Sequence, residues 1–167
     1  MDQRWWARGR RGLLVALLAG TAGFLGGGGA PWRERAGAAE RAPAPEFLNA
    51  DPATTAPYSD AVRVGSTLYL AGNLGLDADG KLVPGGITPE SQRAMENLRH
   101  TLERNGSALD RVVSCLVFLA DIRDREAFNA VYQHSFAQGH FPARSAFGTS
   151  GLYLGARVEI SCVAVAS

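Results

Sequence analysis

Two ionisable residues in the last third of the sequence have types and positions suited to binding and hydrolysing a small acid. Arg144 lies in the segment FPARS, and Glu159 lies in the otherwise apolar stretch VEISCVAVA. A guanidinium binds a carboxylate through two parallel hydrogen bonds and stays charged at any useful pH. A carboxylate in a half-buried strand can orient a water molecule or carry a proton. If the two strands pair, these side chains face a common space; the alternative is a structural ion pair between strands or between subunits.

Other reactive side chains offer weaker patterns. His100, His134 and His140 have spacings that no metal site uses, so we expect no metal centre. Cys115 and Cys162 fall in two expected strands, and we interpret them as small buried hydrophobic residues, with a disulfide as the lesser alternative after export. The sequence therefore predicts neither a metal nor a cofactor.

Hydrophobic periodicity and turn residues define the elements that must position Arg144 and Glu159. The expected elements, in chain order, are strands at 61–64 and 67–71, a helix from Thr88 to Asn105-Gly106, a strand at 111–119, a helix with Asp124 as its N-cap, and strands at 145–150 and 156–165. Thr88 is a favoured N-cap with Pro89 in the first turn, and Gly106 suits the left-handed C-terminal position.

The order of these elements predicts an α+β fold, β-β-α-β-α-β-β, with both helices on one face of a mixed sheet. The strand at 111–119 is apolar on both of its faces, so both should be covered. Two helices cover only one face of such a sheet. An oligomer partner is the natural cover for the other face.

The N-terminal part has the layout of a bacterial-type export signal. Four arginines, including the adjacent Arg10 and Arg11, precede an apolar run at residues 13–25, and small residues at Ala36 and Ala38 offer a cleavage site. We expect an export signal at residues 1–38, either cleaved or retained as a membrane anchor, a linker at 39–56 and a folded domain at 57–167. The alternative is a disordered basic extension on a cytosolic protein.

The charge distribution separates the same two parts. The chain of 167 residues has a net charge of +1, but six of its basic residues fall within residues 1–39, where only Asp2 and Glu34 oppose them. The remainder is net negative and contains one lysine, Lys81, so it has no basic stripe for nucleic acid.

The segments PYSDAVRVGSTLYLAGNLGLD, VFLADIRDREAFNAVY, FPARSAF and VEISCVAVA occur in this order between about residues 56 and 166. Together they resemble the Rid (YjgF-like) family, whose best-known branch is RidA. The resemblance implies a chorismate-mutase-like fold and homotrimers in which the sheets form a closed barrel with the helices outside. It also implies active sites in clefts between subunits.

The resemblance further implies hydrolysis of reactive enamines and imines to 2-keto acids and ammonia, without a metal or cofactor. By position, Arg144 matches the arginine that binds the substrate carboxylate, and Glu159 a glutamate that helps to place water. The other matching site positions are Tyr58, Gly72, Asn73 and Asn129.

This chain departs from the family pattern at four positions near the cleft, which bear on substrate choice. Asn73 replaces a glutamine, Ala71 a serine, Ser161 a glutamate and Ala146 a reactive cysteine. We therefore expect an exported, periplasmic imine/enamine deaminase that forms a homotrimer. The alternatives are a non-catalytic module that holds a small carboxylate in the same cleft and, less supported, a ribonuclease.

Overall fold

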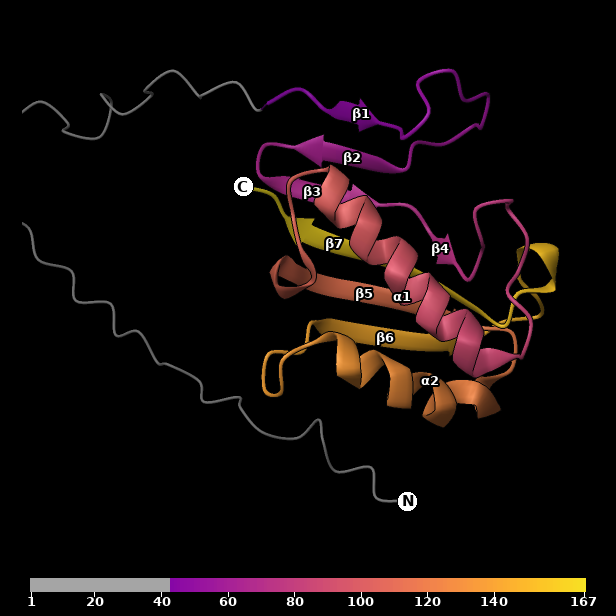
Figure 1. The fold of residues 1–167 in the computed structure, drawn as a ribbon. Coiled ribbons are helices and arrows are strands. Elements are labelled where there is room, and N and C mark those ends of the chain that lie inside the picture. Colours follow the sequence, from indigo (N-terminus) through magenta and orange to yellow (C-terminus); the bar gives the residue numbers. More distant parts are fainter. Residues whose placement is uncertain (1–42) are drawn as a thin grey trace, which may run out of the picture. The chain divides into compact units, whose positions relative to one another are not determined.

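The computed structural model describes residues 43–167, which form one mixed sheet with two helices packed on one face (Figure 1). The fold class expected from the sequence is confirmed. The expected export signal at residues 1–38 and the start of the expected linker lie outside the described residues. No helix within residues 43–167 is both long enough and apolar enough to cross a membrane.

The strand order across the sheet is β1-β2-β3-β7-β5-β6, with the short β4 also pairing with β7. The strands are β1 (Glu46–Leu48), β2 (Ala61–Val64), β3 (Thr67–Leu70), β4 (Asn73–Leu74), β5 (Val112–Leu119), β6 (Ala143–Gly148) and β7 (Val158–Val165). Only β5 and β6 pair in parallel. β1 lies within the segment expected to be a linker. This part of the segment is a strand because its backbone pairs with β2 and extends the sheet.

The helices differ from the expected ones mainly at their N-termini. α1 (Ile87–Arg104) begins one residue before Thr88, and its N-cap is Gly86, which makes no side-chain hydrogen bond. α2 (Arg125–Tyr132) has Asp124 at its N-cap as expected, but that carboxylate accepts hydrogen bonds from Arg157 instead of capping the helix. Tertiary ion pairing has replaced a local cap at this position.

The core lies between the helices and the sheet. Along β7 the residues Val158, Ile160 and Cys162 are buried on the helix side, while Glu159 and Ser161 alternate with them on the other side. Burying one large aliphatic side chain contributes about 1.5–3 kcal/mol. The packing of α1 and α2 on β5 and β7 therefore fixes which side chains each face presents.

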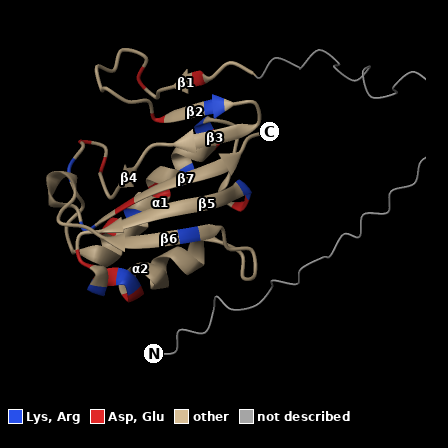
Figure 2. Cartoon of the chain, turned by 180° about the vertical axis from the view of Figure 1, so that it is seen from behind, with Lys and Arg blue, Asp and Glu red and all other residues tan. Residues whose placement is uncertain are grey.

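The face of the sheet opposite the helices is open in the single chain. Figure 2 looks onto this face, where the central strands carry few charged residues. Its exposed apolar side chains are Tyr69, Leu116, Phe147 and Val165. Within the single chain, Leu116 of β5 is 45% exposed, so one face of the strand expected at 111–119 lacks a cover. The expectation that an oligomer partner covers this face stays a prediction.

Candidate active site

Arg144 extends from the edge strand β6 toward α2. Nη2 of Arg144 donates a hydrogen bond to Oδ1 of Asn129 over 2.7 Å. The guanidinium carbon lies 4.4 Å from the ring centroid of Tyr132 and 5.6 Å from that of Phe128. An arginine over an aromatic face gains about 0.5–1 kcal/mol at exposed sites. Three side chains of α2 thus hold the guanidinium at one edge of the sheet.

Tyr132 provides the flat surface beneath Arg144. It is buried, and no hydrogen-bond partner for its phenol oxygen occurs within residues 43–167. Burial raises the pKa of Tyr132 above 10.0, and the charge of Arg144 opposes this only in part. Sequence reasoning did not place Tyr132 next to Arg144. Its spacing of three residues from Asn129 was the available signal, since residues three apart share a helix face.

The guanidinium of Arg144 lines an open cavity of about 490 Å³. The other lining residues are Glu126, Asn129, Tyr132, Gln133, Phe141 and Pro142. In the described part of the chain, no carboxylate lies within ion-pair distance of Arg144. A charged fork held by Asn129 and an aromatic ring is suited to binding a carboxylate from outside the chain.

Glu159 lies on the other face of the sheet, in β7. It pairs in register with Leu74 of β4 and with Phe118 of β5. Its carboxylate lies against the backbone at Gly72, where a Cβ atom would stand 2.6 Å from the Glu159 carboxyl carbon and closer still to Oε1. Only glycine, which has no Cβ atom, lets the Glu159 carboxylate lie this close to the backbone at position 72. The proximity of Gly72 and Glu159 agrees with their assignment to one site.

Glu159 lines a second cavity, which has a volume of about 600 Å³ and a mostly apolar lining. Tyr58, a residue expected at the site, lines this cavity and is 65% exposed. Tyr153, which the sequence did not single out, also lines it. A single carboxylate among apolar and aromatic side chains can hold and orient one water molecule next to a bound ligand.

Asn73 lies beside this cavity, on the helix side of β4. Its Nδ2 donates to the backbone oxygen of Ala71 over 3.0 Å, and its Oδ1 accepts a long hydrogen bond of 3.5 Å from Thr101 of α1. Its register partner in β7 is the core residue Ile160. Asn73 therefore shapes the backbone next to Gly72, while its side chain belongs to the packing against α1.

Arg144 and Glu159 do not share a space within one chain. β5 separates β6 from β7, so the strands that carry the two residues do not pair. Arg144 faces the helix side with its register partner Cys115, whereas Glu159 lies on the open side with Phe118. The condition for a common space, pairing of these two strands, is therefore not met within a single chain, and the two residues form no ion pair within residues 43–167. We call the two separate candidate regions, around Arg144 and around Glu159, half-sites.

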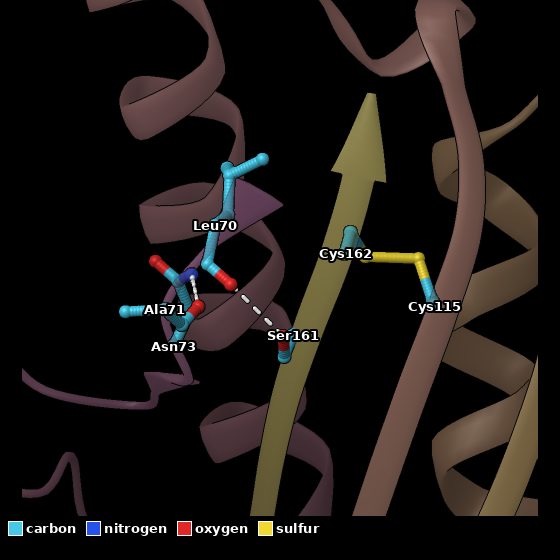
Figure 3. The surroundings of a disulfide bond; sticks show 6 residues. All are labelled: Leu70, Ala71, Asn73, Cys115, Ser161 and Cys162. Atoms are coloured by element: carbon cyan, nitrogen blue, oxygen red, sulfur yellow. Dashed lines mark hydrogen bonds between the residues drawn. A yellow bond between two sulfur atoms is a disulfide. The ribbon is translucent and has the colours of Figure 1, made fainter. Parts of the chain in front are cut away.

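A disulfide joins Cys115 of β5 to Cys162 of β7 (Figure 3). The two residues are buried, as expected, and they form the disulfide that the sequence offered as the lesser alternative. They face each other as register partners in adjacent antiparallel strands, which brings their Cα atoms within 4.1 Å. Next to the disulfide, Oγ of Ser161 donates to the backbone oxygen of Leu70 over 2.9 Å (Figure 3). The residue that replaces a family glutamate thus tethers β7 to the end of β3.

Residues 48–166 match the model of the family described as endoribonuclease L-PSP. The chain belongs to this family, also called YjgF/Rid. The resemblance drawn from the sequence segments is confirmed. The match begins at the end of β1 and runs through β7, so it includes both half-sites.

Curated relatives of the family resemble the chain over the same region. The goat 2-iminobutanoate/2-iminopropanoate deaminase is 46% identical over 115 residues, which are 68% of this chain and 83% of that protein. The human protein of the same name is 39% identical over 115 residues, with the same coverage. Among solved structures, RidA from an Antarctic Psychrobacter species superposes with a TM-score of 0.63 at 33% identity, covering 68% of this chain and 92% of that one.

Proposed function

We propose that this member of the YjgF/Rid family hydrolyses reactive 2-imino and 2-enamino acids to 2-keto acids and ammonia. The supporting observation is a guanidinium, Arg144, held ready by Asn129 and Tyr132 and lacking a carboxylate partner in the described chain. Relatives that are 39–46% identical are named for this reaction. The fixed arginine would bind the carboxylate of the imino acid.

The two half-sites support an active site shared between subunits. Arg144 of one chain would bind the substrate carboxylate, while Glu159 of a neighbouring chain would face the imine carbon. The open apolar face of the sheet, with Leu116 and Phe147 about half exposed, supports the oligomer, because burying such side chains drives association. We propose a homotrimer. It is the smallest ring in which a subunit has two different neighbours, so that its Arg144 contributes to the site shared with one neighbour and its Glu159 to the site shared with the other.

The reaction needs little beyond orientation. Water forms a bond to the imine carbon, the carbon–nitrogen bond then breaks, and nitrogen leaves as ammonia with the protons released from water. Glu159 would accept a hydrogen bond from the attacking water and return its proton to the leaving nitrogen. Holding the carboxylate and one water in place supplies the orientation, which can lower such a barrier by several kcal/mol. The charge of Arg144 complements the substrate throughout.

The disulfide supports the proposal that the protein is exported. Disulfides form and persist in oxidising compartments such as the bacterial periplasm, and they are rare in the cytosol of most organisms. Cys115 and Cys162 are 1% and 2% exposed, so the bond is part of the folded core. We propose that residues 1–38 direct export, and that the domain functions in the oxidising compartment.

The proposal is tested by generating 2-iminopropanoate in situ and following its conversion to pyruvate above the spontaneous rate. We expect wild-type protein to accelerate pyruvate release and Arg144→Ala to reduce the acceleration at least a hundredfold. Equal rates for the two proteins would overturn the assignment of Arg144. Saturable binding of a small carboxylate that depends on Arg144, without turnover, would identify a binding module instead.

A further inference from the structure

Within the single chain, the cavity at Glu159 is larger and more aromatic than a small imino acid requires. Its lining residues besides Gly72 and Glu159 are Ala56, Pro57, Tyr58, Ala71, Leu74 and Tyr153. Its volume of about 600 Å³ falls in the range of pockets that bind drug-sized ligands. The side chain of 2-iminopropanoate is a single methyl group, which would leave most of this apolar surface unfilled.

Tyr153 lines this cavity from an unusual turn. It begins the short segment Tyr153–Gly155, in which Leu154 has a left-handed φ of 57° and Gly155 a φ of 76°. A left-handed leucine is uncommon, and such positions persist only where surrounding structure holds them. Here the backbone nitrogens of Gly155 and Ala156 donate to the oxygens of Leu152 and Tyr153 over 3.0 and 3.1 Å.

The turn fixes the backbone from which the ring of Tyr153 projects, yet the ring itself is 69% exposed. Tyr58, which lines the same cavity, is 65% exposed. Two large rings at one cavity, both mostly in contact with solvent, offer an apolar surface that a ligand side chain could cover. Covering it would contribute to binding without changing the chemistry at Glu159.

We propose that Tyr153 and Tyr58 select 2-imino acids with bulky apolar or aromatic side chains, such as those derived from phenylalanine or leucine. This inference rests on the proposed deaminase function and adds its substrate class. The substrate carboxylate binds Arg144 of the neighbouring subunit, the imine carbon faces Glu159, and the side chain lies between the two tyrosine rings.

The test compares imines generated in situ by an amino-acid oxidase from phenylalanine and from alanine, with spontaneous hydrolysis subtracted. We expect kcat/KM to be at least tenfold higher for the phenylalanine-derived imine, since even one methylene group more or less in an apolar pocket changes kcat/KM roughly 10–200-fold. Tyr153→Ala should lower the ratio of the two values about tenfold, whereas Tyr153→Phe, which keeps the ring, should preserve it. Arg144→Ala should lower both values and leave the ratio unchanged.

An equal or greater kcat/KM for the alanine-derived imine would overturn this inference and leave the deaminase function intact. Loss of the oligomer in Tyr153→Ala, measured by light scattering, would also overturn it, because the ring would then belong to a subunit interface. Absence of turnover with both imines would overturn the proposed function itself.

Discussion

Reduction of the disulfide should destabilise the domain substantially. The bond between Cys115 and Cys162 closes a loop with a sequence separation of 47 residues. In the chain-entropy description, a cross-link of this length restricts the unfolded chain by about 4 kcal/mol at 25 °C, which is an upper value for the measured loss. For a domain of this size the loss corresponds to a decrease of roughly 10–20 °C in Tm.

The assay is thermal unfolding at a fixed protein concentration, because the stability of an oligomer depends on concentration. The bond is buried, so the protein is unfolded in denaturant with a reductant and then refolded under reducing conditions before the measurement. The double variant Cys115→Ala/Cys162→Ala is the control, and its Tm should not respond to the reductant. Equal Tm values for oxidised and reduced wild-type protein would refute the assignment of a stabilising role to the disulfide.

Three further predictions concern the two half-sites. Arg144→Lys should recover only a small part of the activity lost in Arg144→Ala, because an ammonium cannot donate the two parallel hydrogen bonds of a planar guanidinium. Equal activity of Arg144→Lys and the wild-type protein would contradict this. Gly72→Ala should lower kcat at least tenfold, with little change in Tm, because the new methyl group displaces the flexible carboxylate of Glu159; unchanged kcat would exclude this role of Gly72. Folding raises the pKa of Tyr132, so the contribution of this residue to the free energy of unfolding should be fully present below about pH 10 and decrease as the pH rises above it. In urea unfolding curves, Tyr132→Phe should make the free energy of unfolding depend less on pH in this range.

The sequence predicted the fold well because the elements that form it carry strong periodic patterns. In β7 the residues Val158, Ile160 and Cys162 alternate with more polar ones, and α1 and α2 cover the apolar face. The N-terminus of α1 was placed less well, since Thr88 is a favoured cap by type but the helix begins earlier, after Gly86. Local preferences of this kind differ by only about 1 kcal/mol, and tertiary packing outweighs them.

The site was predicted residue by residue but not in its arrangement. Arg144 and Glu159 stand out by type, yet their relation depends on strand order, which places β5 between them. For the same reason the sequence offered the disulfide only as the lesser alternative: two cysteines 47 residues apart become partners only through the register of β5 and β7. Tyr153 gave no signal at all, because its role depends on the left-handed turn that follows it.

The central claim, a site formed by Arg144 of one chain and Glu159 of another, is tested most directly by mixing subunits. Arg144→Ala and Glu159→Gln chains with different affinity tags are produced together, and trimers that contain both are purified through both tags. Each mixed trimer, of either composition, keeps one intact site of the three, so we predict about a third of wild-type activity. Each variant alone should be nearly inactive. Mixed trimers as inactive as the separate variants would contradict a site shared between subunits.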